Sequence, residues 1–249
     1  GMSGRFPQAR NVAELWTLLA EGRDAIEEIP THRFDWREFF VDAGAGLASA
    51  ASLGGKISSR WLGVLPGAEE FDPLFVEISP REAETMDPRQ RLLLQEAFNA
   101  LEDAGYGPEQ LHAERVGMFV GVEQGEYQWL LSNAGLPGLI TGNHDAVLAA
   151  RLAYFLNLHG PVMAINTACS SGLVALHQAC LSLRAGDCEA AIAAGVNLIL
   201  APQTYIAMSQ AGMLSPDGRC RAFDERANGL VPGEAVVAVV LKRLAQARA

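Results

Sequence analysis

Residues 160–173 read GPVMAINTACSSGL, an apolar run that ends at a cysteine flanked by small residues. The small residues after Cys169 suit a tight turn, and residues 173–183 then carry apolar side chains at helical spacing. We therefore expect Cys169 to be a nucleophile at a turn between a strand and a helix. Free N–H groups and the positive dipole end of that helix favour a thiolate and can hold a developing oxyanion.

The helix dipole alone is not expected to hold Cys169 as a thiolate, because a charge near a helix end is stabilised by only ~0.3–1 kcal/mol, up to ~2 kcal/mol when partly buried. A basic partner for Cys169 is therefore also expected. His177 lies on the same predicted helix, about 12 Å along its axis, which is too far for a hydrogen bond. His159 lies near the opposite end of the preceding strand, on the order of 30 Å away. The other histidines are interpreted as surface or structural residues: His32, His112 and His144.

The chain has 249 residues, of which 49% are hydrophobic, enough for one large domain or two small ones. No apolar run reaches the ~18 residues of a membrane span. The start, GMSGRFP, has neither the basic residues nor the apolar core of a secretory signal, which makes the cytoplasm the default location. A net charge of −10 with scattered basic residues argues against a nucleic-acid binder.

The cysteines show no Cys-x-x-Cys spacing, so neither a zinc site nor a disulfide framework is predicted. Apart from Cys169 they are Cys180, Cys188 and Cys220. We interpret these three as inert thiols, since free cysteine is commonly buried as a small hydrophobe.

Helix and strand patterns alternate along the chain. A first helix is predicted from the capping box Asn11 and Glu14 to Gly22, and a second from the N-cap Asp87 to Gly105. The first helix has an apolar face made of Leu15, Trp16, Leu18 and Leu19. Further strands are predicted over 116–122, 162–167, 190–196 and 235–241, the last fully buried, and helices over 145–156, 169–184 and 201–212. Residues 40–56 show no period and predict an exposed loop. The alternation predicts a layered α/β sheet.

Several short motifs follow one another along the chain. They are GRFP at 4–7, FDPLF at 71–75, ISPREA at 78–83, MDPRQR at 86–91, TACSS at 167–171, GMLSPDGRC at 212–220 and FD at 223–224. Their order and density resemble the β-ketoacyl synthases, specifically the ketosynthase domains of modular polyketide synthases. The resemblance covers nearly the whole chain.

The resemblance implies a thiolase-like fold of layered α, β, α, β, α elements, a homodimer, and decarboxylative Claisen condensation of carrier-bound thioesters in polyketide or fatty acid biosynthesis. In the family, the cysteine at the turn between strand and helix takes an acyl group from the phosphopantetheine arm of an acyl carrier protein. A carbanion from a malonyl unit then attacks the carbonyl of this acyl group. By residue matching, this cysteine is Cys169. No directly bound cofactor is expected. The implied partners are the carrier protein and neighbouring polyketide synthase domains.

The chain departs from the family pattern at named positions. Asn166 stands where Asp is frequent, Ala146 where Ser is common, and NGLVPGEA at 228–235 replaces a segment that usually ends in Gly-Glu-Gly. The combination of INTACSSG at 165–172 and VPGEA at 231–235 resembles ketosynthases of trans-acyltransferase assembly lines.

The family's two histidine segments, His-Gly-Thr-Gly-Thr and a later Gly-His, do not occur in the sequence. We therefore expect residues 1–249 to form the N-terminal half of the domain, with the first core strand and the C-terminal half absent. The isolated chain is then expected not to carry out the full condensation.

Met208 falls where the family often has Phe before Ser209, so it is a candidate wall of the acyl channel, and Thr204 one turn earlier is a second candidate. Ordinary packing is the alternative for both residues. Arg89 and Arg91 are interpreted as surface or intersubunit contacts, with a phosphopantetheine or carrier-protein contact as the alternative.

Other functions stay open beside a condensing ketosynthase. One is a condensation-silent ketosynthase that only transfers acyl chains, and another is a non-catalytic fragment or partner subunit of the same fold. The presence of Cys169 argues against a non-catalytic partner subunit, because this cysteine would be expected to be replaced there. An unrelated cysteine hydrolase would need a histidine within reach of Cys169 inside this chain.

Overall fold

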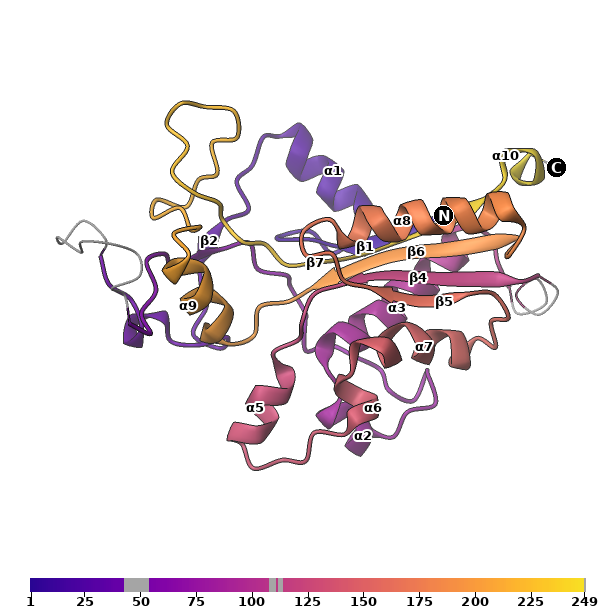
Figure 1. The fold of residues 1–249 in the computed structure, drawn as a ribbon, viewed down its shortest axis with the longest axis horizontal. Helices are drawn as coiled ribbons and strands as arrows, with labels where there is room; N and C mark the ends of the chain where they lie inside the picture. Colours follow the sequence, from indigo (N-terminus) through magenta and orange to yellow (C-terminus); the bar gives the residue numbers. More distant parts are fainter. Residues whose placement is uncertain (43–53, 108–110, 112–113, 249) are drawn as a thin grey trace.

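The computed structural model describes residues 1–42, 54–107, 111 and 114–248. Its centre is a five-stranded sheet in the order β1-β7-β6-β4-β5 (Figure 1). β4 is parallel to both β5 and β6, whereas β7 is antiparallel to β6 and β1. The sheet is therefore mixed. Its strands are β1 (Met2–Arg5), β4 (Val116–Val122), β5 (Val162–Ile165), β6 (Ala190–Asn197) and β7 (Ala235–Lys242).

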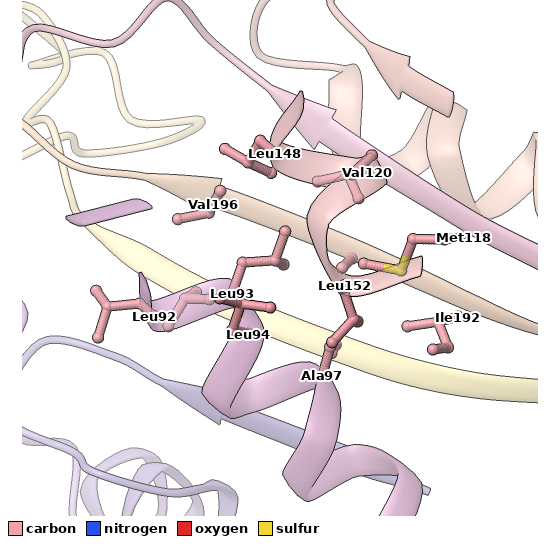
Figure 2. Close-up of a cluster of buried hydrophobic side chains, with 14 of the residues drawn as sticks. Leu92, Leu93, Leu94, Ala97, Met118, Val120, Leu148, Leu152, Ile192 and Val196 are labelled. Carbon is pink, nitrogen blue, oxygen red and sulfur yellow. The ribbon is translucent and has the colours of Figure 1, made fainter. Parts of the chain in front are cut away.

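Helices cover both faces of this sheet. α8 (Ser171–Ala185) lies on one face, and α3 (Pro88–Asp103) and α7 (Asp145–Phe155) lie on the other (Figure 1). Figure 2 shows how leucines of α3 and α7 meet side chains of β4 and β6 in the main core. The labelled residues are Leu92, Leu93, Leu94, Ala97, Met118, Val120, Leu148, Leu152, Ile192 and Val196. The predicted layered α/β sheet is confirmed.

The apolar runs explain which strands are central. Every residue of β4 is buried, and six of the eight in β6 are buried, because helices pack on both sides of these strands. The prediction that β7 is fully buried was wrong. Only Val236 and Ala238 of that strand are buried. The other residues of β7 are partly exposed. β7 is therefore packed less completely than the central strands β4 and β6.

The capping residues set the helix starts as predicted. The Asn11 carboxamide accepts from the N–H of Glu14 at 2.8 Å and starts α1 (Val12–Ala20). Asp87 accepts from the N–H of Arg89 at 2.8 Å and starts α3. The apolar face predicted on α1 is not buried as a whole: Leu18 is buried, but Trp16 is 71% exposed.

Several short elements lacked a sequence signal. β1 is the most notable, because the first core strand was expected to be absent, yet residues 2–5 pair with β7. Whether a further strand belongs before it stays a prediction. The other short elements are β2 (Glu27–Glu28), η1 (Trp36–Glu38), β3 (Trp61–Leu62), α2 (Pro80–Thr85), α5 (Tyr127–Asn133), α6 (Ile140–Asn143) and α10 (Leu244–Ala247).

The predicted loop 40–56 is only partly described, because residues 43–53 lie outside the described part of the chain. At its ends, the N–H of Val41 donates to the carbonyl of Ile57 at 3.0 Å, and Ile57 is fully buried. This loop is therefore closed by a core contact. No helix in the described ranges is long and apolar enough to cross a lipid bilayer.

Candidate active site

Cys169 lies on a tight turn between β5 and α8. Ala168 before it has a φ of +54°, in the left-handed region that a side chain rarely adopts. The helix was predicted to begin at Cys169, but α8 begins at Ser171, with Ser170 as its N-cap. Cys169 thus stands just before the helix, and its side chain is exposed. A strained, exposed position of this kind is typical of functional turns.

Hydroxyl groups hold this turn in place. The Ser171 hydroxyl accepts from the N–H of Thr167 at 2.9 Å and donates to the carbonyl of Ala168 at 2.6 Å. Ser170 donates from its hydroxyl to the carbonyl of Thr167 at 2.8 Å. The small residues after Cys169 therefore do more than fit a tight turn, because their side chains cross-link it.

Asn166 connects the turn to the end of β4. Its Oδ1 accepts from the N–H of Ala168 at 3.0 Å, and its Nδ2 donates to Oε1 of Glu123 at 3.5 Å. An aspartate at this position would keep the first bond but would place a second carboxylate next to Glu123. Asn166 therefore fits the neighbouring carboxylate better than an aspartate would.

Gly121 on β4 lets the first turn of α8 approach the sheet. A Cβ at this position would lie 2.5 Å from the backbone nitrogen of Gly172 and 2.6 Å from the carbonyl carbon of Ser171. Both contacts are with backbone, which cannot rotate away. The turn that carries Cys169 is thus seated directly on a glycine of the sheet.

Replacing Gly121 with alanine is expected to push the first turn of α8 off the sheet and to lower the free energy of unfolding by about 1–3 kcal/mol. Urea unfolding followed by circular dichroism measures this change. Gly172→Ala is the matched control, because a Cβ at Gly172 meets nothing within 4 Å. Equal stability of the two variants would contradict the close contact.

The turn opens into a pocket of about 560 Å³. It lies where the parallel strands β4, β5 and β6 end, the edge at which α/β sheets usually bind ligands. Most of its lining is apolar, as an acyl chain requires. The lining residues are Gly121, Val122, Glu123, Gln124, Ala168, Cys169, Ser171, Gly172, Gly195, Val196, Asn197, Leu198, Ile199, Thr204, Met208, Met213, Leu230, Pro232, Gly233, Ala235 and Val237.

The structure brings together the three residues singled out from the sequence. Cys169 comes from the turn before α8, whereas Thr204 and Met208 come from α9 (Pro202–Gln210), and all three line the pocket. The Thr204 hydroxyl is hydrogen-bonded to Glu126. The roles of Thr204 and Met208 as walls of an acyl channel stay a prediction.

The pocket lining contains no basic side chain. The described histidines, His32, His144, His159 and His177, all lie outside it. His144 accepts from the N–H of Ala146 at 3.2 Å and caps α7, which is a structural role as predicted. His112 lies outside the described residues. The basic partner expected for Cys169 is therefore not part of the described pocket.

The other cysteines differ from one another. Cys188 is buried, and burial raises the pKa of its thiol, which suits an inert residue. Cys180 is half-buried. Cys220 does not have the burial on which its interpretation as an inert thiol rested, because it is exposed in the long segment between α9 and β7, where its Sγ accepts from the N–H of Val231 at 3.2 Å. That it is inert stays a prediction. Among the described residues, no cluster of side chains fits a metal ion.

Arg89 was interpreted as a surface or intersubunit contact, and this was wrong. Its side chain is 3% exposed and lies between the carboxylates of Asp87 and Asp145, each 2.9 Å away. It also donates to the carbonyl of Glu123, at the pocket. Gly125 makes room for it, since a Cβ there would lie 1.9 Å from the guanidinium. Arg89 therefore anchors the loop that follows β4.

Two buried glutamates near the pocket had no sequence signal for their role. Glu234 accepts from the N–H groups of Leu65 at 2.8 Å and Ile199 at 2.9 Å, and from Arg33 at 3.1 Å. Burial raises the pKa of the Glu234 carboxyl, against the effect of Arg33. Glu126 caps α9. Only spatial contacts identify these residues, because their partners are far away in sequence.

Comparison with known proteins shows consistent similarity. Residues 1–247 match the family model described as the N-terminal domain of beta-ketoacyl synthase. Polyketide synthase PksM of Bacillus subtilis is 50% identical over 247 residues, which are 99% of this chain and 6% of PksM. Polyketide synthase ThaG of Burkholderia thailandensis is 52% identical over 249 residues, which are 100% of this chain and 4% of ThaG. The chain thus spans only a small part of these relatives.

Solved structures agree with the sequence comparison. The ketosynthase from module 6 of the bacillaene synthase of Bacillus subtilis superimposes with a TM-score of 0.89 at 45% identity and covers 100% of this chain. An oxazolomycin ketosynthase domain from Streptomyces albus superimposes with a TM-score of 0.91 at 40% identity. This chain matches 40% of the first structure and 42% of the second.

Proposed function

Because the chain belongs to the β-ketoacyl synthase family, as the N-terminal part of a polyketide synthase ketosynthase domain, we propose that it supplies the acyl-accepting centre of a condensing enzyme. Cys169 is the proposed nucleophile. The observation that carries this proposal is its exposed thiol on a strained turn, at the mouth of a mostly apolar pocket.

The proposed reaction has two steps. In the first, the Cys169 thiolate attacks the carbonyl of an acyl thioester, the bond to the phosphopantetheine sulfur breaks, and an acyl-Cys169 thioester forms. In the second, a malonyl thioester loses carbon dioxide, and the resulting carbanion attacks the acyl carbonyl. A carbon–carbon bond forms and the Cys169 thiolate leaves.

The described residues support the first step in particular ways. The turn fixes the thiol just before the N-terminus of α8, and the positive end of the helix dipole favours negative charge there. The pocket offers Val196, Leu198 and Ile199 to an acyl chain. The groups that assist decarboxylation are proposed to come from outside this chain, because no basic residue lines the pocket.

The polyketide synthase relatives imply substrates on a carrier protein and neighbouring synthase domains. We propose the phosphopantetheine arm of an acyl carrier protein as the acyl donor, with no cofactor bound directly. A homodimer, a cytoplasmic location and the trans-acyltransferase type also remain proposals, the last resting on the residue combination around Cys169 and Glu234.

The test is product formation by the complete protein that contains this chain. Acyl and malonyl units on a carrier protein are expected to give a β-ketoacyl thioester, detected by mass spectrometry of the carrier. Acyl transfer to the protein without product would instead identify the condensation-silent alternative. Neither transfer nor product would overturn the proposed function.

A further inference from the structure

A buried carboxylate links two walls of the pocket. Glu126 is 3% exposed and lies just after the end of β4. Its Oε2 accepts from the N–H groups of Leu200 at 2.7 Å and Ala201 at 3.0 Å. Its Oε1 accepts from the N–H of Thr204 at 3.2 Å and from the Thr204 hydroxyl. Every one of these donors belongs to the start of α9 or to the residues before it.

α9 depends on this outside acceptor. Its N-cap residue is Ala201, which has no side chain that can accept a hydrogen bond. The first N–H groups of a helix need acceptors, and a negative charge at this end is favoured by the helix dipole. Glu126 supplies both, and hydrogen bonds to an ionised group are the stronger kind.

Glu126 lies at the end of the short loop 123–126 that follows β4, and the start of this loop also lines the pocket. Glu123 and Gln124 line the pocket near Cys169, whereas Thr204 and Met208 line it from α9. Arg89 fixes the carbonyl of Glu123 at the start of this loop, and Glu126 fixes α9 at its end. The loop therefore sets how far α9 lies from the wall formed by the end of β4.

We propose that Glu126 is a positioning residue that sets the width of the pocket and thereby selects which acyl chains fit beside Cys169. The acyl part of this statement rests on the proposed function. The geometric part does not, since an alkyl chain on Cys169 that enters the pocket meets the same walls whatever reaction the protein carries out. Glu126 itself is not among the lining residues and acts through α9.

The test compares two thiol reagents, N-octyl maleimide and N-methyl maleimide, on Cys169 of the complete protein. Peptide mass spectrometry follows Cys169 separately from the other cysteines. The octyl reagent is expected to gain rate from the pocket. In Glu126→Gln, an amide N–H replaces one acceptor of the cap, so α9 shifts. The octyl-to-methyl rate ratio is then expected to fall by about tenfold, equivalent to about 1.4 kcal/mol, with the N-methyl rate unchanged.

Glu96→Gln is the matched control. Glu96 is also a buried carboxylate, 2% exposed, but it holds Ser3 and Arg5 of β1 and does not line or cap the pocket. A loss of stability without a change in the ratio is expected there. The same ratio in Glu126→Gln and the unmodified protein, or an equal fall in both variants, would overturn the proposal.

If Glu126→Gln does not fold, Thr204→Val tests the positioning role of Glu126 instead. It removes one donor to Glu126 and leaves the three backbone N–H groups, so a smaller fall in the ratio is expected, and an unchanged ratio counts against the proposal. The proposed function fails by a different result, namely no acyl transfer from a thioester to the unmodified protein. The maleimide ratio is measurable in either case.

Discussion

Replacing Cys169 with alanine in the complete protein is expected to abolish formation of the β-ketoacyl product, because the variant has no atom that can hold the acyl group between the two steps. Removing the nucleophile of a covalent mechanism typically lowers the rate by several orders of magnitude. Product on the carrier protein, measured by mass spectrometry, reports the loss.

Cys220→Ala is the matched control for this variant. Cys220 is the other exposed thiol among the described residues, but it does not line the pocket. Activity close to that of the unmodified protein is expected. Product formation by Cys169→Ala at more than a trace would refute the assignment of the nucleophile.

Replacing Arg89 with alanine is expected to cost about 3–5 kcal/mol in the free energy of unfolding, as is typical when one partner of a buried ion pair is removed. The change leaves the buried Asp87 carboxylate without its cation. It also releases the carbonyl of Glu123 at the pocket. Chemical unfolding of the two proteins measures the difference.

Arg10→Ala provides the comparison for Arg89. Arg10 pairs with Glu70 at 2.8 Å, but both side chains are about half exposed, and exposed pairs contribute little. No measurable change is expected. If the two variants unfold at the same denaturant concentration, Arg89 is not the anchor that the structure indicates.

Local patterns predicted the elements of the sheet well. Residues 116–122 give β4 with the expected bounds, since a short apolar run covered on both faces leaves a clear signal. Asn11 and Asp87 mark their helices because capping depends on residues close in sequence. Residues 2–5 gave no such signal, and this strand exists because it pairs with β7, more than two hundred residues later in the chain.

The sequence singled out residues that line the pocket, but not the buried charged residues that hold the pocket walls in place. Cys169 stands out because small residues surround it, and the family resemblance pointed to Thr204 and Met208, which line the same pocket. These charged residues have hydrogen-bond partners that are distant in sequence. Glu126 meets the start of α9 across 74 residues, and Arg89 meets Asp145 across 56. A charged residue in isolation reads as a surface residue, so only the fold reveals these contacts.

In the proposed reaction, Cys169 is the residue that receives the acyl group. The most direct measurement is to treat the complete protein with an acyl thioester, digest it, and locate the acyl group by peptide mass spectrometry. One acyl group on the peptide that contains Cys169 is the predicted result. An acyl group spread equally over Cys169, Cys180 and Cys220, or absent from Cys169, would show that Cys169 is not the acyl acceptor.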